Sequence, residues 1–389
     1  MKDNLLVLAF ILALTGFGAL HASNVMIDGL FYNLKIADST AILTRDNNDY
    51  YAYQNYTDVI IPETVTWQNV TYTVWKIDDY AFAGCTRLKS LVVPNTVSAV
   101  GYRAIHGCDS LAYLEVPDMS MIYTLPNHLE HVVVNGGEMD ADSYDRLRLS
   151  ASSLSYLDLS GITNTTMPIR ALYDCYRLDT LLLPEGLERL DYMVLAECVN
   201  LKNIDIPASV QEIGDRAFEN CRMLNTVTFS GNNLNRIGNW AFFQCLQLQN
   251  IIIPEGVTEI GYAAFYACAY LNEVSLPASI QQIGDQAFAS CSRMTRMNVD
   301  AVLPPTIDSR TFDEVSRTMP VYVPDASVNT YKADALWGQL NIVGTSGEGT
   351  SLDNTIGTTP SVRKLFDNGH LYLLLPDGTR FDATGKRVE

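Results

Sequence analysis

Residues 217–238 read AFENCRMLNTVTFSGNNLNRIG, and the same frame returns as AFFQCLQLQNIIIPEGVTEIG at 241–261 and as AFYACAYLNEVSLPASIQQIG at 264–284. Each copy opens on Ala-Phe, carries a cysteine and a leucine at fixed offsets, and closes on Ile-Gly. The eight cysteines of the chain follow the same spacing, with intervals of 23, 67, 23, 23, 24, 23 and 23 residues. A period near 23 residues is typical of a solenoid, in which every repeat is one coil stacked on its neighbours.

Each recurring position has a physical reason. The pattern Leu-x-x-Ile-x-Ile alternates with a period of two, which indicates a short strand with its apolar side chains on one face. The proline that often follows ends the strand, because it offers no N–H for the ladder. Glycine after isoleucine permits a tight bend, and Ala-Phe supplies a small and a large side chain to the core. We therefore expect one parallel strand in every repeat.

These columns resemble those of a known repeat family. The frame also fits Ala81-Phe82 with Cys85, and it recurs elsewhere with Ile or Leu in place of Phe. Over roughly residues 77–300 the chain resembles the BspA-type leucine-rich repeat family of bacterial secreted and cell-surface proteins. The resemblance implies an α/β-type repeat solenoid, a right-handed coil of leucine-rich repeats with a parallel concave β-sheet.

The repeat pattern changes in the middle of the chain. Between Asp118 and Arg170 the strand columns persist at 129–134 and 154–159, but the Ala-Phe and Cys columns are missing. We expect two coils there with altered convex sides, and about ten strands in all.

The first residues predict export. Met1-Lys2 precedes an apolar run, and Leu20-His21-Ala22 ends in a small residue. This pattern is typical of a secretory signal peptide over residues 1–22, and it is too short for a stable membrane anchor. We therefore expect a secreted or surface-exposed protein with no integral membrane segment after signal cleavage.

The remaining flanks predict caps and a tail. Residues 23–76 hold strand-like runs and predict an N-terminal β cap that shields the first coil, while 301–344 predict a C-terminal cap. Residues 345–361 are rich in Gly, Ser and Thr and predict a linker. In residues 362–389, Asn368-Gly369 and Asp377-Gly378 interrupt apolar runs, which predicts a short β-hairpin tail. The tail resembles a shortened form of the C-terminal sorting tails of Bacteroidetes secreted proteins, and a β-meander without a sorting role stays open.

The cysteines admit two interpretations. An even number of cysteines in an exported protein indicates disulfides, and equivalent positions in adjacent coils lie close enough to be bridged. Parallel side chains that all point inward do not readily give the near-perpendicular S–S torsion. A ladder of free, buried thiols that donate to turn carbonyls fits that geometry better.

Charge and motifs exclude several classes of function. Acidic residues outnumber basic ones by 44 to 26, which gives a net charge of −18 and argues against binding nucleic acid. Outside the signal segment we find no G-x-S-x-G, Walker, H-E-x-x-H or Rossmann motif. His128 and His131 form an isolated H-x-x-H pair, and the acidic stretch 46–49 lacks EF-hand spacing. We expect no catalytic residue, metal site or cofactor.

The strand register predicts a candidate binding surface. The two residues that flank the central apolar position of each strand are expected on the concave face. Tyr113, His131 and Tyr156 then form one row across three strands, with Glu115 and Asp158 beside it. Aromatic rings with nearby carboxylates are good anchors for a protein or a sugar. The alternative is that tall side chains simply pack together on the sheet; the irregular insert at 135–153 could add a loop that completes a pocket.

Two functions from different classes follow. The first is an exported, non-catalytic module that mediates protein–protein or cell adhesion through its concave sheet. The family resemblance implies host or bacterial surface macromolecules as partners, including matrix proteins such as fibronectin or fibrinogen. The second is a glycan-binding accessory protein or enzyme of the cell surface. A purely structural surface-layer component would require self-association, which the acidic surface does not favour.

Overall fold

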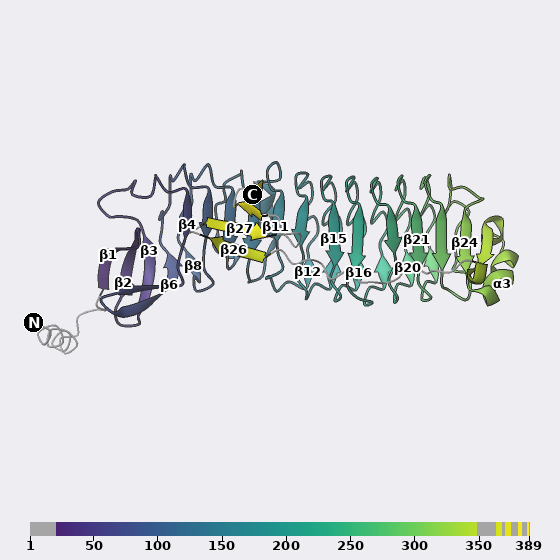
Figure 1. The fold of residues 1–389 in the computed structure, drawn as a ribbon, viewed down its shortest axis with the longest axis horizontal. Helices are drawn as coiled ribbons and strands as arrows, with labels where there is room; N and C mark the ends of the chain where they lie inside the picture. The colour runs from purple at the N-terminus through teal and green to yellow at the C-terminus, as the bar shows by residue number, and fades with distance from the viewer. Residues whose placement is uncertain (1–20, 348–362, 368–369, 375–379, 383–386, 389) are drawn as a thin grey trace, which may run out of the picture.

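The protein is an elongated solenoid of stacked coils (Figure 1). The computed structural model describes residues 21–347 and, in the C-terminal segment, 363–367, 370–374, 380–382 and 387–388. The predicted signal segment therefore lies almost wholly outside the described residues. Strands dominate the described chain, and helix is scarce. The stacked parallel-strand solenoid expected from the repeats is confirmed.

One side of the solenoid is formed by the longer strand of every coil. This long-strand sheet comprises β4 (Asp58–Ile60), β7 (Ser90–Val92), β9 (Tyr113–Val116), β10 (His131–Val134), β11 (Tyr156–Asp158), β13 (Thr180–Leu182), β15 (Asn203–Ile206), β17 (Thr226–Phe229), β19 (Asn250–Ile252), β21 (Glu273–Leu276), β23 (Arg296–Val299), β24 (Pro320–Val323) and β25 (Asn341–Gly344). All of its printed pairings are parallel. The expectation of about ten strands was too low, because β4 precedes the predicted repeat region and β24 and β25 follow it.

The Ile-Gly column forms a second parallel sheet that the sequence pattern did not reveal. This short-strand sheet contains β12 (Thr166–Met167), β14 (Arg189–Leu190), β16 (Glu212–Ile213), β18 (Arg236–Ile237), β20 (Glu259–Ile260) and β22 (Gln282–Ile283). Two residues are too few to show an alternation, so this sheet leaves no periodic signal in the sequence. Its second residues, such as Ile213 and Ile237, are buried in the main core.

The two ends of the solenoid have different structures. At the N-terminal end lies a sheet of β1 (His21–Ile27), β2 (Leu30–Lys35), β3 (Thr40–Thr44), β6 (Val70–Ile77) and β5 (Thr64–Trp67), in that order. Strand β6 also pairs in parallel with β8 (Ala99–Val100), which joins this sheet to the coils. At the other end, near α3 (Val328–Ala333), Trp337 donates from Nε1 to Pro305 O at 2.7 Å and Tyr331 donates to Ala301 O at 2.8 Å. These bonds provide acceptors for the indole N–H and the hydroxyl of two large buried side chains.

The C-terminal segment contains a separate antiparallel sheet. Its strands are β26 (Arg363–Asp367), β27 (His370–Leu374), β28 (Arg380–Asp382) and β29 (Arg387–Val388), paired in that order. The Asn-Gly and Asp-Gly pairs predicted as turns, 368–369 and 377–378, lie outside the described residues.

The turns between the sheets carry two left-handed backbone positions in most repeats. The first lies before the Ala-Phe pair, as at Arg216 with φ 59° and Trp240 with φ 53°, and the second lies before the cysteine, as at Asn220 with φ 61°. Most of these residues are not glycine, although the left-handed conformation is unfavourable for residues that carry a Cβ atom. Hydrogen bonds between successive turns hold it: Phe218 N donates to Ala241 O at 2.7 Å and Phe242 N to Ala264 O at 2.7 Å. A ladder of backbone bonds thus runs along the turn edge.

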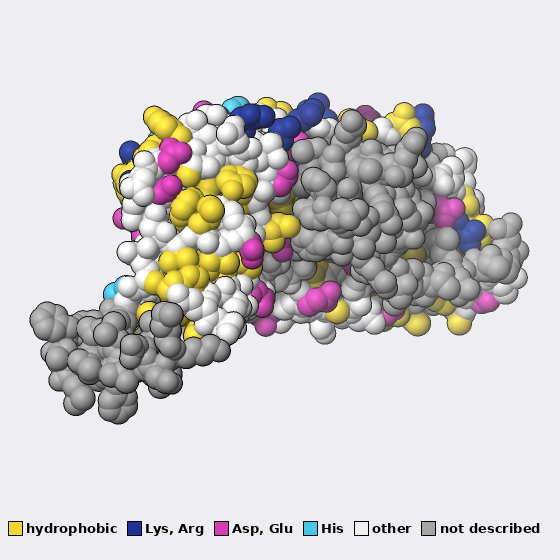
Figure 2. Space-filling view, turned by 60° about the vertical axis from the view of Figure 1, so that its left-hand side comes forward, with side chains coloured by type: hydrophobic (Ala, Val, Ile, Leu, Met, Phe, Trp, Pro, Cys, Tyr) yellow, Lys and Arg dark blue, Asp and Glu magenta, His cyan; other side chains and the backbone are white. Residues whose placement is uncertain are grey.

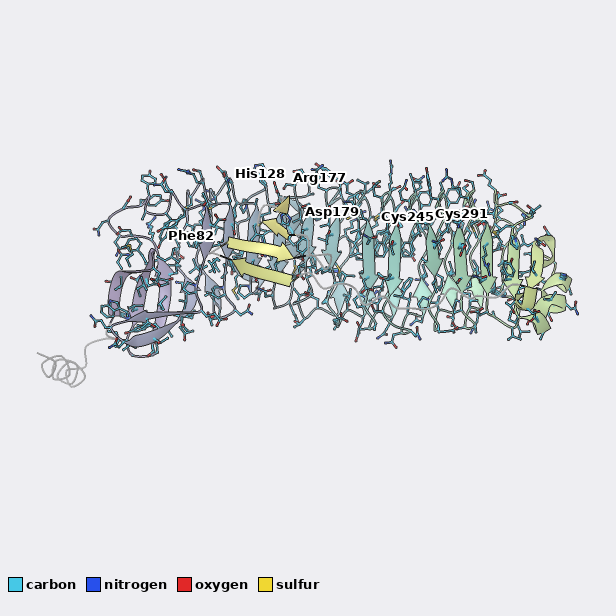
Figure 3. The ribbon with its side chains drawn as sticks, viewed as in Figure 1. Phe82, His128, Arg177, Asp179, Cys245 and Cys291 are labelled. Atoms are coloured by element: carbon cyan, nitrogen blue, oxygen red, sulfur yellow. The ribbon has the colours of Figure 1, made fainter. Side chains whose placement is uncertain are left out.

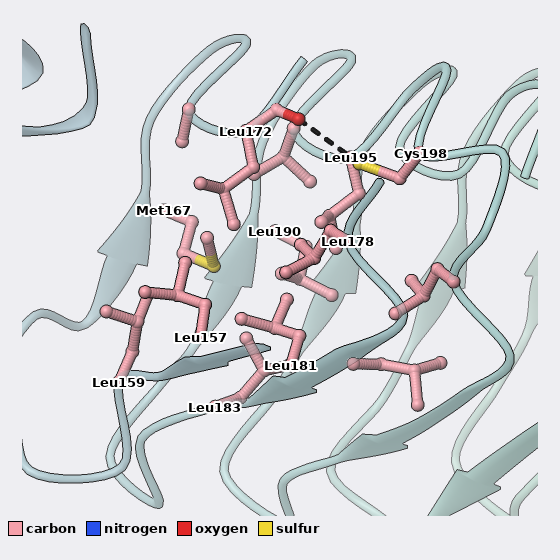
Figure 4. Packing of buried hydrophobic residues seen from close by; sticks show 14 of the residues in the cluster. Leu157, Leu159, Met167, Leu172, Leu178, Leu181, Leu183, Leu190, Leu195 and Cys198 are labelled. Carbon is pink, nitrogen blue, oxygen red and sulfur yellow. Dashed lines mark hydrogen bonds between the residues drawn. The ribbon is translucent and has the colours of Figure 1, made fainter. Parts of the chain in front are cut away.

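The core repeats with the coils. Phe218, Phe242, Phe265, Phe288 and Phe312 stack in one column, with successive ring centroids 5.0, 5.1, 5.2 and 5.8 Å apart and interplanar angles of 5° or less. Leucines fill the same space in the central coils, where the Ala-Phe frame is altered (Figure 4). Each ring of the column stacks on the rings of the adjacent coils, so these contacts connect nearest neighbours along the solenoid.

The cysteines form a ladder of free, buried thiols, as favoured from the sequence. Cys198 Sγ donates to Leu172 O at 3.2 Å (Figure 4), and the same bond to the preceding turn recurs at Cys108, Cys221, Cys245, Cys268 and Cys291, with distances of 3.1–3.3 Å. Cys245 and Cys291 lie along one edge of the solenoid (Figure 3), and the turn of Cys268 lies between theirs. In these six coils the thiol is a second donor to a turn carbonyl that already accepts a backbone N–H of its own turn, as Leu172 O does from Cys175 N at 3.3 Å.

We expect these thiols to be unreactive while the protein is folded. Burial raises the pKa of Cys85 to about 11 and that of Cys108 to about 12, so at neutral pH the thiolate fraction falls roughly 100-fold or more below that of a free cysteine. In an Ellman assay, the folded protein should release almost no chromophore, and all eight thiols should react in guanidinium chloride. Rapid labelling of the folded chain, or a mass that shows bridged cysteines, would contradict the ladder.

The irregular insert contains a helix rather than a pocket-forming loop. Residues Ala141–Arg148 form α2, and the Asp140 carboxylate caps it by accepting from Ser143 N at 2.8 Å. Tyr144 and Leu147 are buried in the main core. The insert therefore replaces the missing Ala-Phe turn on the core side of the sheet. The helix itself lies on the core side, whereas Asn135 at the start of the insert bonds to Glu115 beside the aromatic row.

Candidate binding surface

The aromatic row expected from the sequence is present on the long-strand sheet. His131 of β10 pairs with Tyr113 of β9 on one side and with Tyr156 of β11 on the other. The rings of His131 and Tyr156 are stacked, with centroids 5.8 Å apart and an interplanar angle of 27°. Equal register in adjacent parallel strands brings these side chains together, because residues at the same position of the pleat share a face.

Polar groups surround this row. The Tyr113 hydroxyl donates to Glu115 Oε2 at 2.9 Å, and Asn135 Nδ2 donates to the other oxygen, Oε1, at 2.9 Å. Asp158, which lies two residues beyond Tyr156, accepts from Ser160 N at 2.9 Å and from Ser160 Oγ at 2.6 Å. Both carboxylates are therefore oriented by neighbours. Asn135 was not singled out from the sequence, because it lies beyond the strand, at the start of the insert.

The row is buried, although it lies on the sheet face away from the main core. Tyr113 is 0% exposed, Tyr156 8% and Glu115 7%. Burial raises the pKa of Tyr113 far above its ordinary value, and the nearby charge of Glu115 adds to the effect. Burial also raises the pKa of Tyr156, and the nearby charges of Asp158 and then Glu115 add to the effect. Both hydroxyls therefore stay protonated throughout the physiological range.

A small apolar cluster accompanies the row. Val92, Tyr113, Val133 and Tyr156 pack together, with Leu182 against them, as a cluster separate from the main core. We call it the aromatic patch. From the sequence, Val92, Val133 and Leu182 were expected on the flanking positions of their strands, but a patch was not predicted. Their occurrence at the same position of β7, β10 and β13 is the sequence feature that could have indicated one.

The equivalent positions farther along the sheet are open. On β15, β17 and β19 the first flanking residues Asn203, Thr226 and Asn250 are exposed, and so is Ile252. Their neighbours bond across strands: Thr228 Oγ1 donates to Asp205 Oδ1 at 2.9 Å. We call the flanking positions of β15 to β21 the open section. The long-strand face is thus divided into a buried aromatic part and an exposed, mainly polar part.

Several polar and apolar side chains outside the long-strand sheet are exposed. Asp46 Oδ1 accepts from Asn48 N at 2.9 Å, as in the polar turn expected there, and His128 is exposed at the turn edge (Figure 3). Within the described residues, His, Cys, Asp and Glu do not gather in threes that could hold a metal ion. Hydrophobic side chains are visible around the N-terminal end (Figure 2), where Met26, Tyr50, Tyr51 and Val70 are exposed. Among the helices of the described chain, none has the length and apolar character needed to cross a bilayer.

The repeat geometry agrees with a family comparison. The model of the BspA type leucine rich repeat region matches residues 46–129, 149–248 and 223–342, with six copies. The chain belongs to the BspA-type leucine-rich repeat family. The matched ranges include β4 and reach β25, which agrees with a long-strand sheet that extends past residues 77–300. A leucine-rich repeat fold of this type suggests protein–protein interaction.

Solved leucine-rich repeat structures resemble the chain at low identity. A leucine-rich repeat protein from Bacteroides ovatus is 21% identical, with a TM-score of 0.34, and the match covers 82% of this chain and 99% of that one. A leucine rich cell surface protein from Faecalibacterium prausnitzii is 19% identical, with a TM-score of 0.31 and coverage of 86% and 97%. A protein from Eubacterium ventriosum is 14% identical, with a TM-score of 0.35 and coverage of 77% and 96%. Curated proteins give no match to this chain.

Proposed function

We propose that this protein is an exported, non-catalytic surface protein that holds a macromolecular partner on its long-strand sheet and so mediates adhesion. The observation that carries the proposal is the open section. On β15, β17 and β19, adjacent strands present Asn203, Thr226 and Asn250 to solvent in one column. Such a surface is pre-organised, because the side chains stand on a hydrogen-bonded sheet and little backbone entropy is lost when a partner binds.

The aromatic patch supplies the second half of this proposed surface. Tyr113, Glu115, His131, Tyr156 and Asp158 would act as anchors at one end, and the open section would add polar contacts. Aromatic side chains surrounded by polar contacts are typical of binding hot spots. Because the patch is buried in the free chain, a partner would reach it only after the segment that covers it has moved away. The partner class follows from the family: a protein on a host or bacterial surface, with the matrix proteins fibronectin and fibrinogen as the partners to test.

Export rests on the sequence of residues 1–22, which has the charge and apolar pattern of a signal peptide. The structure of an exported solenoid also has to tolerate an oxidising environment. Burial of all eight thiols serves that need, because a thiol without access to solvent neither oxidises nor exchanges readily.

We expect the immobilised full chain to bind purified fibronectin or fibrinogen in surface plasmon resonance. Two double variants test the face: Asn203→Ala with Asn250→Ala in the open section, and Tyr113→Ala with Tyr156→Ala in the aromatic patch. At least one should weaken binding by about tenfold or more, which corresponds to about 1.4 kcal/mol. Glu188→Ala, an exposed residue just before β14 in the short-strand sheet, is the control and should bind as the wild type does.

Three results would refute the proposal. The first is the absence of binding to both matrix proteins, and the second is equal binding by the two double variants and the wild type. The third is turnover of a glycan by the purified chain, which would establish the enzyme alternative. If the chain binds to a glycan array and to neither matrix protein, the long-strand face would be a glycan-binding surface instead.

A further inference from the structure

The aromatic patch is buried on a face that no coil of the solenoid covers. Strands β7, β9 and β10 are buried at every residue, so both faces of the sheet are shielded there. One face packs on the main core. The other carries the aromatic patch, and at the corresponding position five strands beyond Val133, Ile252 is 39% exposed. A flat sheet surface does not reduce Tyr113 to 0% exposure by itself, so a further layer covers it.

We propose that the C-terminal sheet β26–β29 of the same chain is this layer. In Figure 1 the strands β26 and β27 are drawn in front of the long-strand sheet between the labels of β4 and β11. The patch and the terminal sheet would form a two-layer sandwich, with β7 to β11 as one layer and β26–β29 as the other. The inference stands whether or not a partner binds elsewhere on the face.

The pairing register of the terminal sheet supports this role. Phe366 pairs with Leu371, and Leu373 pairs with both Lys364 and Phe381. The alternate positions carry Leu365, Tyr372 and Leu374 beside Asp367, His370 and Asp382, so apolar residues occur at both sets of paired positions. A four-stranded sheet of this size has too few residues for a core of its own, and packing on a second layer would bury its apolar residues.

The chain is long enough to reach the patch. The path from β11 to β25 crosses β13, β15, β17, β19, β21, β23 and β24, which at about 4.8 Å per step is about 38 Å. Residues 345–362 join β25 to β26, and an extended chain of that length spans roughly 60 Å. Covalent connection also raises the local concentration of the tail at the patch, to the millimolar range for a linker of suitable length.

Charge favours the same contact. Residues 362–389 contain five basic and four acidic residues, whereas the whole chain carries −18. The patch is bordered by the carboxylates of Glu115 and Asp158. A slightly basic unit is therefore attracted to an acidic body, and any partner that uses the aromatic patch would have to displace the terminal sheet first.

The test uses the full chain with a specific protease site placed within residues 348–361. After cleavage, size-exclusion chromatography with mass spectrometry reports whether the terminal fragment stays with the solenoid. We expect the wild-type fragment to co-elute with the solenoid. In Val133→Lys, which places a charge in the patch, we expect most of the fragment to elute separately. Ile252→Lys, the same column position in the open section, is the matched control and should retain the fragment.

The logic of the two variants is that a lysine on an uncovered sheet face is solvated and harmless, whereas a lysine under a second layer is not. Circular dichroism melts establish that both variants remain folded. Release of the fragment from the wild type upon cleavage would overturn the proposal, and so would equal retention by the wild type and both variants. A dimeric mass by light scattering before cleavage would show that the tail covers a second copy instead, and would also overturn it.

Discussion

Replacement of Phe242 by alanine is expected to lower the free energy of unfolding by about 3–5 kcal/mol. The ring is 0% exposed and lies between Phe218 and Phe265, at centroid distances of 5.0 and 5.1 Å. Its removal takes away the buried apolar area and leaves a cavity that two rigid coils cannot close. It also removes both stacking contacts, each worth about 0.5–1.5 kcal/mol beyond burial.

Guanidinium chloride unfolding followed by circular dichroism measures this loss. The matched control is Phe243→Ala at the next position, where the side chain is only partly buried and stacks on Tyr266 at 5.3 Å. We expect the control to lose about 1 kcal/mol. Because each coil interacts only with its neighbours, Phe242→Ala should also broaden the transition as the coils on either side uncouple. Equal losses in the two variants would show that the phenylalanine column is not the main link between coils.

The second large effect is expected for Gly261→Ala. A Cβ atom built on Gly261 would lie 2.6 Å from Asn239 N and 2.7 Å from Gly238 C, both of them backbone atoms of the preceding coil. Backbone cannot move aside as a flexible side chain does, so the two coils would have to separate at the bend. We expect a loss of roughly 3 kcal/mol or more in the free energy of unfolding. The same close approach at Gly238 and Gly284 shows that the bend repeats along the solenoid.

Gly186→Ala is the control for this prediction. No atom lies within 4 Å of the Cβ position at Gly186, and its backbone is outside the left-handed region. Alanine there should be neutral or should stabilise the protein by up to about 1 kcal/mol, because it restricts the unfolded chain. Thermal and denaturant unfolding of the two variants separate close approach between coils from a general effect of losing glycine. Similar stabilities for the two variants would contradict the steric argument.

Some features of the fold could not be predicted from the repeat. The left-handed turn positions are held by residues as different as Arg216, Trp240 and Ala263, so residue type gives no signal. There the bonds between neighbouring turns compensate for the local strain. At the ends, β24 and β25 continue the sheet without the Ala-Phe and Cys columns, which made them look like a cap. Helix α2 substitutes for one turn and places Ser143, Tyr144 and Leu147 at buried positions.

The candidate site divides in the same way. The alignment of Tyr113, His131 and Tyr156 could be predicted, because a parallel sheet with one strand per repeat leaves no freedom of register once the central residues are assigned. The burial of these three side chains could not be predicted from the repeat. The exposure of a side chain on this face depends on which segment covers the sheet, and the covering segment lies outside the repeat.

By itself, the sequence determined the period, the parallel strand in each coil, the phenylalanine and cysteine columns and the family. These follow from contacts between equivalent positions of adjacent coils, which a repeating sequence states directly. Only the tertiary structure decided which part of the long-strand face is open, where the insert packs and how far the sheet extends. Those properties arise from contacts between segments distant in the chain, and no local pattern encodes such contacts.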